Sequence, residues 1–168
     1  TTVTAGFPLS ITPGNVYTMD DIMNMSAEEA DNFMKNIYIE LVTGEEGQEI
    51  YTKFFRVISG ESGAQGPYLF HCLAGKDRTG IAAALFLLAM GADRDTVYKD
   101  YMLSAGYVKE KYAQTVKERP GMAPMLTVKK EYIETALDTI DREYNDIYSY
   151  LRNQLGVDIE ALQAIYLE

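Results

Sequence analysis

The sequence predicts an α/β fold, in which a parallel sheet is flanked by helices. Residues 68–71 (YLFH) form a short apolar run, which is expected of a central parallel strand covered by helices on both faces. A loop of small residues follows, and then an apolar helix from Ile81 to Met90. Most of the remaining chain has helical periodicity, so we expect the C-terminal part to be rich in helices.

The composition indicates one globular domain over residues 1–168. This length can bury a sizeable core, and 47% hydrophobic with 24% charged residues is ordinary for a folded protein. The formal net charge of −10 argues against nucleic acid or an anionic membrane surface as partner, because both attract basic patches. No apolar run reaches the length of a membrane span, so we expect no stable membrane insertion.

Histidine and cysteine each occur once, as the neighbours His71 and Cys72. A single cysteine allows no disulfide within the chain, and one Cys–His pair is too few ligands for a zinc site. We therefore expect no metal and no cofactor. The expected location is cytoplasmic, but the chain begins at Thr1 without a methionine, which leaves export open.

The N-terminal part opens with a weak strand pattern. Pro8 within it suits an edge strand or an early strand end. Further on, Ser26 and Glu29 have the spacing of a capping box, which predicts the start of a helix. The expected elements are a strand over 3–11, a turn over 12–15, and helices over 26–42 and 46–58.

The part of the chain after Met90 is expected to consist of helices. Gly91 ends the apolar helix, and residues 119–121 (RPG) break a later one. Tyr101 is expected to face inward. The predicted helices run from Asp93 or Asp95 to Ser104 and from Val108 to Glu118, and three more begin at the caps Thr127, Asn145 and Asp158.

Only two segments, 3–11 and 68–71, are credible strands. Two strands cannot make a stable sheet with both faces covered, because such a sheet needs neighbours on both edges of its central strand. We therefore expect the sheet to be incomplete in this chain. An upstream segment or a second chain would supply the missing strands.

The loop between the strand and the apolar helix is a predicted anion site. Backbone N–H groups of the loop and of the first helical turn converge there, at the positive end of the helix dipole. Cys72 opens the loop and Arg78 closes it. These groups favour a thiolate, and they also suit a phosphate, which Arg78 can bind through two oxygens. The pattern fits attack of sulfur on phosphorus through a phosphocysteine.

Other loop residues have expected roles in the same chemistry. Gly75 lets the backbone turn its amides inward, Thr79 can donate its hydroxyl to the departing thiolate, and His71 orients the loop through its backbone. Lys76 adds a cation at the loop mouth. The expected phosphate-binding residues are Leu73, Ala74, Gly75, Lys76, Asp77 and Arg78.

The loop sequence allows two other interpretations. Cys72 could be a buried core thiol, as most free cysteines are, but the full pattern His-Cys-x-x-Gly-Lys-x-Arg-Thr-Gly is far more specific than Cys-x5-Arg alone. A nucleotide-binding P-loop is excluded, because Lys76 is followed by Asp77 and no glycine stands five positions before Gly75.

Residues 71–80 (HCLAGKDRTG) resemble the signature of cysteine-dependent protein tyrosine phosphatases, in particular a bacterial group of tyrosine and dual- or lipid-specific enzymes. Residues 100–104 (DYMLS) and the run 143–157 resemble later elements of that group. The resemblance implies a parallel sheet flanked by helices and metal-independent hydrolysis of phosphate monoesters. It also implies N-terminal strands, with Arg-Asp-Leu-Gly-Gly-like and Asp-Leu-Arg-Ser-like elements, that this sequence does not contain.

The general acid that protonates the leaving oxygen has several candidates. Asp77 lies inside the loop, and some related lipid phosphatases are thought to use an aspartate just before the arginine. Asp77 could equally be structural, pairing with a basic residue. Asp20, Asp21 or an acid in the missing segment are the alternatives.

The sequence thus predicts a hydrolase acting on phosphotyrosine, with phosphoserine, phosphothreonine and phosphoinositides as open alternatives. The expected partner is a phosphorylated protein or a phosphoinositide. Two competing hypotheses are a sulfur- or arsenate-transfer enzyme with a similar loop, and an inactive fragment that binds phosphate without turnover.

Overall fold

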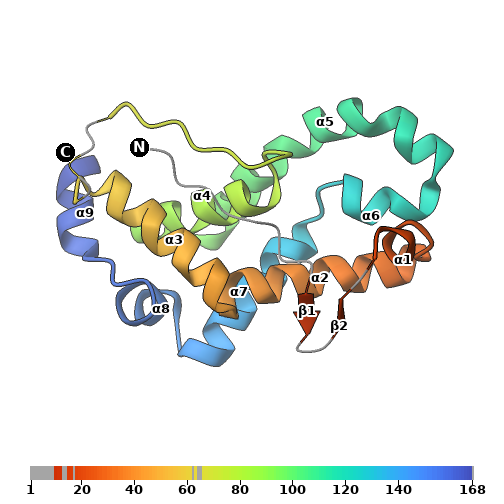
Figure 1. The fold of residues 1–168 in the computed structure, drawn as a ribbon. Helices are drawn as coiled ribbons and strands as arrows, with labels where there is room; N and C mark the ends of the chain where they lie inside the picture. The colour runs from red at the N-terminus through yellow and green to blue at the C-terminus, as the bar shows by residue number, and fades with distance from the viewer. Residues whose placement is uncertain (1–9, 13–14, 17, 62, 64–65, 168) are drawn as a thin grey trace.

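The computed structural model describes residues 10–12, 15–16, 18–61, 63 and 66–167, and it shows a helical molecule (Figure 1). Two short strands lie near the N-terminus, and the described residues after them form helices and loops. In chain order the elements are β1 (Ser10–Thr12), β2 (Asn15–Val16), α1 (Met19–Met23), α2 (Ala27–Thr43), α3 (Glu45–Ile58), α4 (Asp77–Ala89), α5 (Arg94–Glu118), η1 (Pro120–Met122), α6 (Ala123–Leu126), α7 (Lys130–Tyr144), α8 (Ile147–Asn153) and α9 (Ile159–Tyr166).

Capping side chains fix most helix starts. Ser26 and Glu29 form the predicted capping box of α2, and Asp93 and Asp158 cap α5 and α9 as expected. Two predicted caps were wrong. α7 begins after Lys129 rather than at Thr127, and α8 is capped by Asp146.

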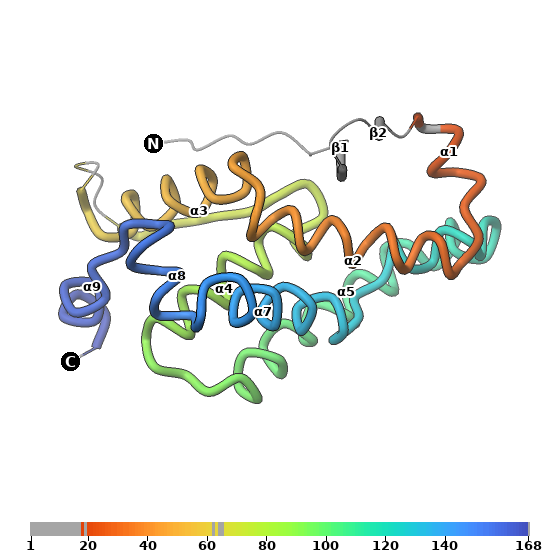
Figure 2. The backbone as a smooth tube through the Cα atoms, turned by 90° about the horizontal axis from the view of Figure 1, so that it is seen from below, coloured from red at the N-terminus to blue at the C-terminus, as the bar shows by residue number. Residues whose placement is uncertain are grey.

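The core lies between α2, α4 and α7. α2 packs along α7, while α4 packs against α5, α7, α8 and α9. In Figure 2, α3 and α2 run along one side of the molecule, and α7 and α8 run beside them. The largest side chains that are fully buried in this core are Tyr38, Tyr51, Tyr132, Tyr150, Ile37, Leu41, Ile81, Leu85, Ile133, Leu137, Ile140 and Leu151.

The predicted parallel sheet flanked by helices is wrong for the described residues. Their only sheet is the antiparallel pair of β1 and β2. Residues 67–72 have no regular secondary structure, and the Leu69 side chain, expected to be buried, is 91% exposed. A strand needs a neighbouring strand to pair with, and no described segment occupies that position. In the predicted strand 3–11, residues 3–9 lie outside the described residues, as do residues 13–14 of the predicted turn.

The helical predictions were closer, with one clear difference. α5 is a single helix from Arg94 to Glu118, although two helices were expected on either side of Gly106. A glycine within a helix costs only about 1 kcal/mol relative to alanine, so it weakens a helix without having to end it. Gly91, in contrast, has a φ of +87° and follows the end of α4 as predicted. Among the described helices, none combines the length and apolar character of a membrane span.

Candidate active site

The loop with Cys72 connects the extended residues 67–71 to α4. Gly75 has a φ of +72°, a left-handed conformation that glycine adopts without strain. Lys76 occupies the N-cap position of α4 and makes no capping hydrogen bond with its side chain. The first-turn N–H groups of α4 therefore lack the side-chain acceptor that α2 and α5 possess.

Donors converge on the half-buried sulfur of Cys72. Burial raises the pKa of the Cys72 thiol, but hydrogen bonds from the Thr79 hydroxyl and from the backbone of Thr79, Gly75 and Ala74 outweigh it, so the pKa lies below its ordinary value. The Thr79 hydroxyl is buried, and no other described residue forms a hydrogen bond with it. The loop thus stabilises a thiolate, which is the nucleophilic form of cysteine.

Arg78 is the second residue of α4 and is partly buried beside the loop. Tyr51 of α3 is fully buried. Burial raises the pKa of the Tyr51 hydroxyl, the charges of Tyr150, Cys72 and Asp77 raise it further, and the charge of Arg78 lowers it. The Tyr51 hydroxyl is thus an interior group within electrostatic reach of the loop.

Asp77 is held by two neighbours. Its Oδ1 accepts hydrogen bonds from Lys76 Nζ at 2.7 Å and from Tyr38 Oη at 2.8 Å. Lys76 is only 3% exposed, so its ammonium group faces the interior rather than the mouth of the loop where the sequence had suggested it. The sequence allowed a structural role for Asp77 in which it pairs with a basic residue, and that residue is Lys76.

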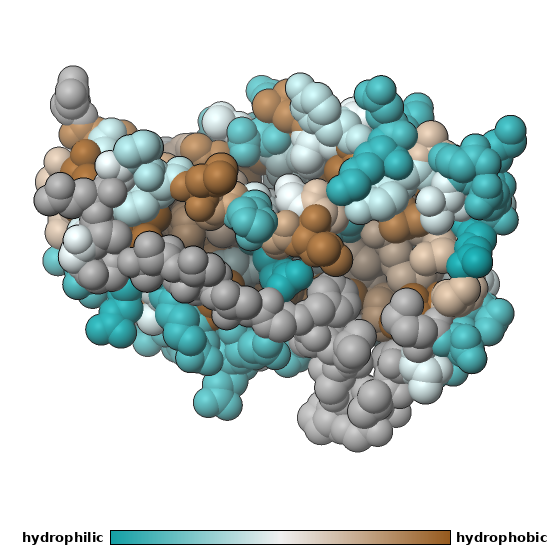
Figure 3. Space-filling view, turned by 45° about the horizontal axis from the view of Figure 1, so that its top comes forward, coloured by the Kyte–Doolittle hydropathy of each residue, from teal (hydrophilic) through white to brown (hydrophobic). Residues whose placement is uncertain are grey.

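The remaining loop residues face solvent to different degrees. His71 is exposed, and its Nδ1–H donates to the Cys72 carbonyl oxygen at 3.2 Å, which is the backbone contact expected of it. The Leu73 side chain is 91% exposed and points away from the core. Figure 3 shows such exposed apolar side chains, in brown, scattered among hydrophilic ones.

The two alternative acids lie in α1. Asp21 accepts hydrogen bonds from the backbone and hydroxyl of Thr18, and these bonds lower its pKa. Its carboxylate is therefore committed to capping α1. Asp20 is exposed on the same helix. Within the described residues, no cluster of three or more His, Cys, Asp or Glu side chains could hold a metal ion.

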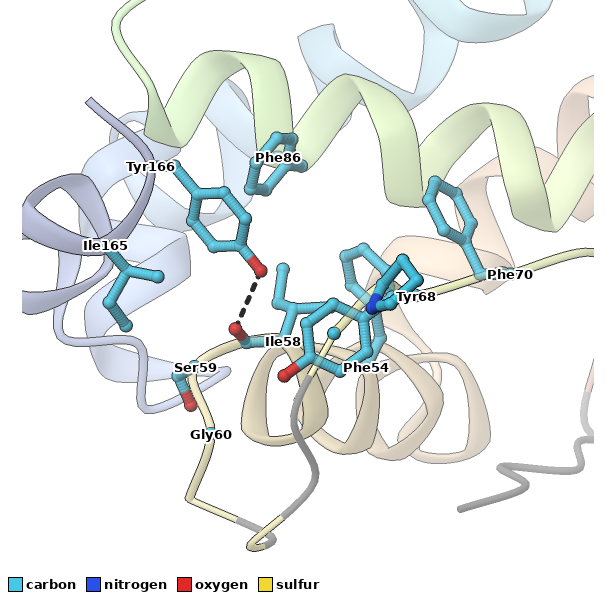
Figure 4. Close-up of a pocket in the computed structure, with 11 residues that line it drawn as sticks. Phe54, Ile58, Ser59, Gly60, Tyr68, Phe70, Phe86, Ile165 and Tyr166 are labelled. Atoms are coloured by element: carbon cyan, nitrogen blue, oxygen red, sulfur yellow. Dashed lines mark hydrogen bonds between the residues drawn. The ribbon is translucent and has the colours of Figure 1, made fainter. Parts of the chain in front are cut away.

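A separate apolar pocket of about 590 Å³ lies between α3, α4, α9 and the extended segment (Figure 4). Phe54, Phe86 and Tyr166 are among its walls, and the Tyr166 hydroxyl donates to the Ile58 carbonyl at 2.8 Å. None of its lining residues is charged, so this pocket does not suit a phosphate. It contains neither Cys72 nor Arg78.

The chain is similar to known tyrosine phosphatases. The sequence pattern of the tyrosine phosphatase family matches residues 12–168. A protein of Cupriavidus necator named as a tyrosine-protein phosphatase is 32% identical over 147 residues, covering 83% of this chain and 51% of that protein. The triple specificity protein phosphatase PtpB of Mycobacterium tuberculosis is 31% identical over 144 residues, covering 75% of this chain and 51% of that protein. The chain thus spans about half the length of these curated relatives.

Proposed function

The chain belongs to the tyrosine phosphatase family, and from this premise we propose that it hydrolyses phosphate monoesters, with phosphotyrosine as the first substrate. The observation that carries the proposal is the depressed pKa of Cys72, caused by donors that converge on its sulfur. The same donors suit the equatorial oxygens of a phosphate placed above the sulfur.

The reaction would proceed in two steps. The Cys72 thiolate attacks phosphorus, a sulfur–phosphorus bond forms, and the bond to the tyrosine oxygen breaks as that oxygen takes up a proton. Water then attacks the phosphocysteine and releases inorganic phosphate and the thiolate. Arg78 and the backbone N–H groups of residues 73–78 bind the phosphate oxygens, and Thr79 donates its hydroxyl to the departing thiolate.

Asp77 is the proposed proton donor to the leaving oxygen. It lies one residue before Arg78, and its carboxyl is held in place through Oδ1 by Lys76 and Tyr38. Asp21 is the weaker candidate, because its carboxylate already caps α1. Hydrolysis of an ester whose leaving group needs no proton, such as an activated phenolate, should proceed at the same rate in Asp77→Asn. Hydrolysis of an alkyl phosphate should be slower in this mutant.

Two parts of the proposal concern the rest of the protein. We propose that residues 1–168 form a single phosphatase domain. We also propose that phosphoserine, phosphothreonine or phosphoinositides are further substrates, since one relative is named a triple specificity phosphatase.

The direct test compares wild-type protein with Cys72→Ser on a phosphotyrosine peptide and on a soluble phosphoinositide. Wild-type protein should release phosphate, and acid quenching should trap a phosphoenzyme that is absent from Cys72→Ser. The mutant should lose activity by roughly a thousandfold or more. Equal activity in both proteins would refute the covalent mechanism.

Two controls separate the competing functions. Binding of inorganic phosphate by Cys72→Ser shows that the loop is intact in the mutant. Turnover of thiosulfate or arsenate by wild-type protein, without release of phosphate from esters, would instead identify a sulfur- or arsenate-transfer enzyme. Binding of phosphate without any turnover would identify an inactive phosphate-binding protein.

A further inference from the structure

Two buried tyrosines meet behind the loop, and neither contacts the substrate in the proposed mechanism. Tyr38 comes from α2 and Tyr101 from α5, and both contact the beginning of α4. Their hydroxyl oxygens lie 2.6 Å apart, and the Tyr38 hydroxyl is also 2.8 Å from Asp77 Oδ1. A run of hydrogen bonds therefore joins α5, α2 and α4.

The direction of these hydrogen bonds follows from counting protons. A tyrosine hydroxyl has a single proton, and Asp77 Oδ1 accepts from Tyr38 and Lys76, so the proton that Asp77 would donate in catalysis belongs on Oδ2. Tyr38 therefore donates to Asp77, and the proton between the two tyrosines must belong to Tyr101. The result is a directed chain from Tyr101 to Tyr38 to Asp77, in which each bond polarises the next.

Burial keeps this chain in one protonation state. Tyr38 is fully buried and Tyr101 is 4% exposed. Burial is also the main reason that the pKa values of both hydroxyls are raised above the ordinary value for tyrosine. Both tyrosines thus remain neutral donors throughout the pH range in which a phosphatase would be assayed.

The tyrosine rings are fixed by packing. A Cβ atom on Gly80 would lie 2.8 Å from two ring carbons of Tyr101, so only glycine lets this ring rest on the first turns of α4. The Tyr38 ring meets the Tyr101 ring edge-on, with centroids 6.5 Å apart, and its other neighbour is the Tyr132 ring at 5.6 Å. The packing of both rings therefore holds the Tyr38 hydroxyl beside Asp77 and the Tyr101 hydroxyl beside Tyr38.

We propose that Tyr38, supported by Tyr101, is a positioning residue that holds Asp77 and with it the first turn of α4. That turn carries Arg78 and Thr79, so the chain of hydroxyls sets the donors around Cys72. This role rests on the proposed function for its effect on catalysis. Its effect on the acidity of the thiol does not depend on turnover.

The test is Tyr38→Phe, measured by the rate of Cys72 alkylation with iodoacetamide as a function of pH. The pKa of the thiol should rise by about half a unit or more, because the first turn of α4 loses its tether. For an alkyl phosphate, kcat should fall about tenfold with little change in KM. The titratable or charged groups around this site are Lys76, Asp77, Arg78, His71, Tyr51, Tyr101 and Tyr132.

Tyr150→Phe is the matched control. Tyr150 is as buried as Tyr38, and Tyr150→Phe removes one hydrogen bond, from its hydroxyl to the Val42 carbonyl at 2.8 Å, which joins α8 to α2. Tyr38→Phe removes two, so Tyr150→Phe should lower stability somewhat less, and it should leave the pKa of the thiol unchanged. A thiol pKa that is the same in Tyr38→Phe and Tyr150→Phe would overturn the proposal.

Tyr101→Phe extends the test and covers the case in which Tyr38→Phe does not fold. It should give a smaller shift in the same direction, since Tyr38 can still donate to Asp77. No shift in a folded Tyr101→Phe, with Tyr38→Phe unfolded, would also overturn the proposal. If wild-type protein releases no phosphate while the thiol shift is observed, the proposed function fails and the positioning role stands.

Discussion

The two segments that flank the loop are supported very differently. α4, which follows the loop, is built into the core, and its Ile81, Leu85 and Ala89 are fully buried. The extended segment that precedes the loop has Leu69 at 91% and Phe70 at 42% exposure. The contrast indicates that, within the described residues, the geometry around Cys72 is set from the helix side.

The same contrast holds for polar contacts. On the helix side, Asp77 is held by Lys76 and Tyr38 in the interior. On the other side, His71 makes its hydrogen bond to the carbonyl of its own neighbour, Cys72. A buried polar network costs much more to break than an exposed local bond, so changes on the two sides should differ in effect.

The largest expected difference in unfolding free energy comes from replacing a leucine by alanine in α4 and in the extended segment before the loop. Leu85→Ala should lower the free energy of unfolding by about 3 kcal/mol, because it leaves a cavity in the core beside α4. Leu69→Ala should change it by less than about 0.5 kcal/mol, since that side chain is already in water. Urea unfolding measures both values. Equal losses would show that the extended segment is buried in solution and would break the comparison.

The next largest effect concerns the close approach of α5 to α4. Gly80→Ala should destabilise the protein by about 2 kcal/mol, because its methyl group would collide with the Tyr101 ring. Gly106→Ala is the control, since a Cβ there meets nothing and the residue lies within α5. It should stabilise the protein by roughly 0.5–1 kcal/mol. Thermal unfolding of both variants measures the difference, and a neutral Gly80→Ala would argue against tight packing.

A smaller effect, on the order of 1 kcal/mol, is expected from acid. Asp31 of α2 pairs with Lys129 and Lys35, and hydrogen bonds from these lysines hold its pKa well below the usual range despite burial. A depressed carboxyl pKa adds stability above the unfolded-state pKa of about 3.9, and that stability is lost as the pH falls below it. The difference in unfolding free energy between wild type and Asp31→Asn should therefore be constant from pH 7 to 5 and shrink by pH 3. If the difference in unfolding free energy does not change with pH, the ion pair between Asp31 of α2 and Lys129 does not contribute to stability.

The smallest effect tests the interior side of the loop. Tyr51 is fully buried and, in the part of the chain that the structure describes, its hydroxyl has no hydrogen-bond partner. Tyr51→Phe removes an unsatisfied polar group without changing the ring, so it should raise stability by about 0.5–1 kcal/mol. Chemical denaturation at neutral pH would detect this gain. A loss instead would reveal that the hydroxyl is satisfied in solution.

Local patterns predicted the local structure well. Ser26, Asp93 and Asp158 cap helices as their spacing indicated, and Gly75 provides the left-handed turn of the loop. The sheet was mispredicted, because an apolar run such as 68–71 becomes a strand only when other strands lie beside it.

The long-range contacts around the loop could not be predicted from the sequence. Tyr101 was expected to face inward, but its hydroxyl partner Tyr38 lies 63 residues away, and no pattern joins them. The burial of Lys76 was missed for a similar reason. A lysine in a loop is normally exposed, and only the tertiary structure provides the carboxylate that lets it be buried.

The low pKa of Cys72 has a consequence for oxidative chemistry. A thiolate reacts with peroxide to give a sulfenic acid, which is rescued when a second thiol condenses with it to form a disulfide. Cys72 is the only cysteine in these 168 residues, so this chain has no resolving thiol of its own. Recovery through a disulfide therefore requires a thiol from outside these residues, and without one continued exposure leads to the irreversible sulfinic and sulfonic acids.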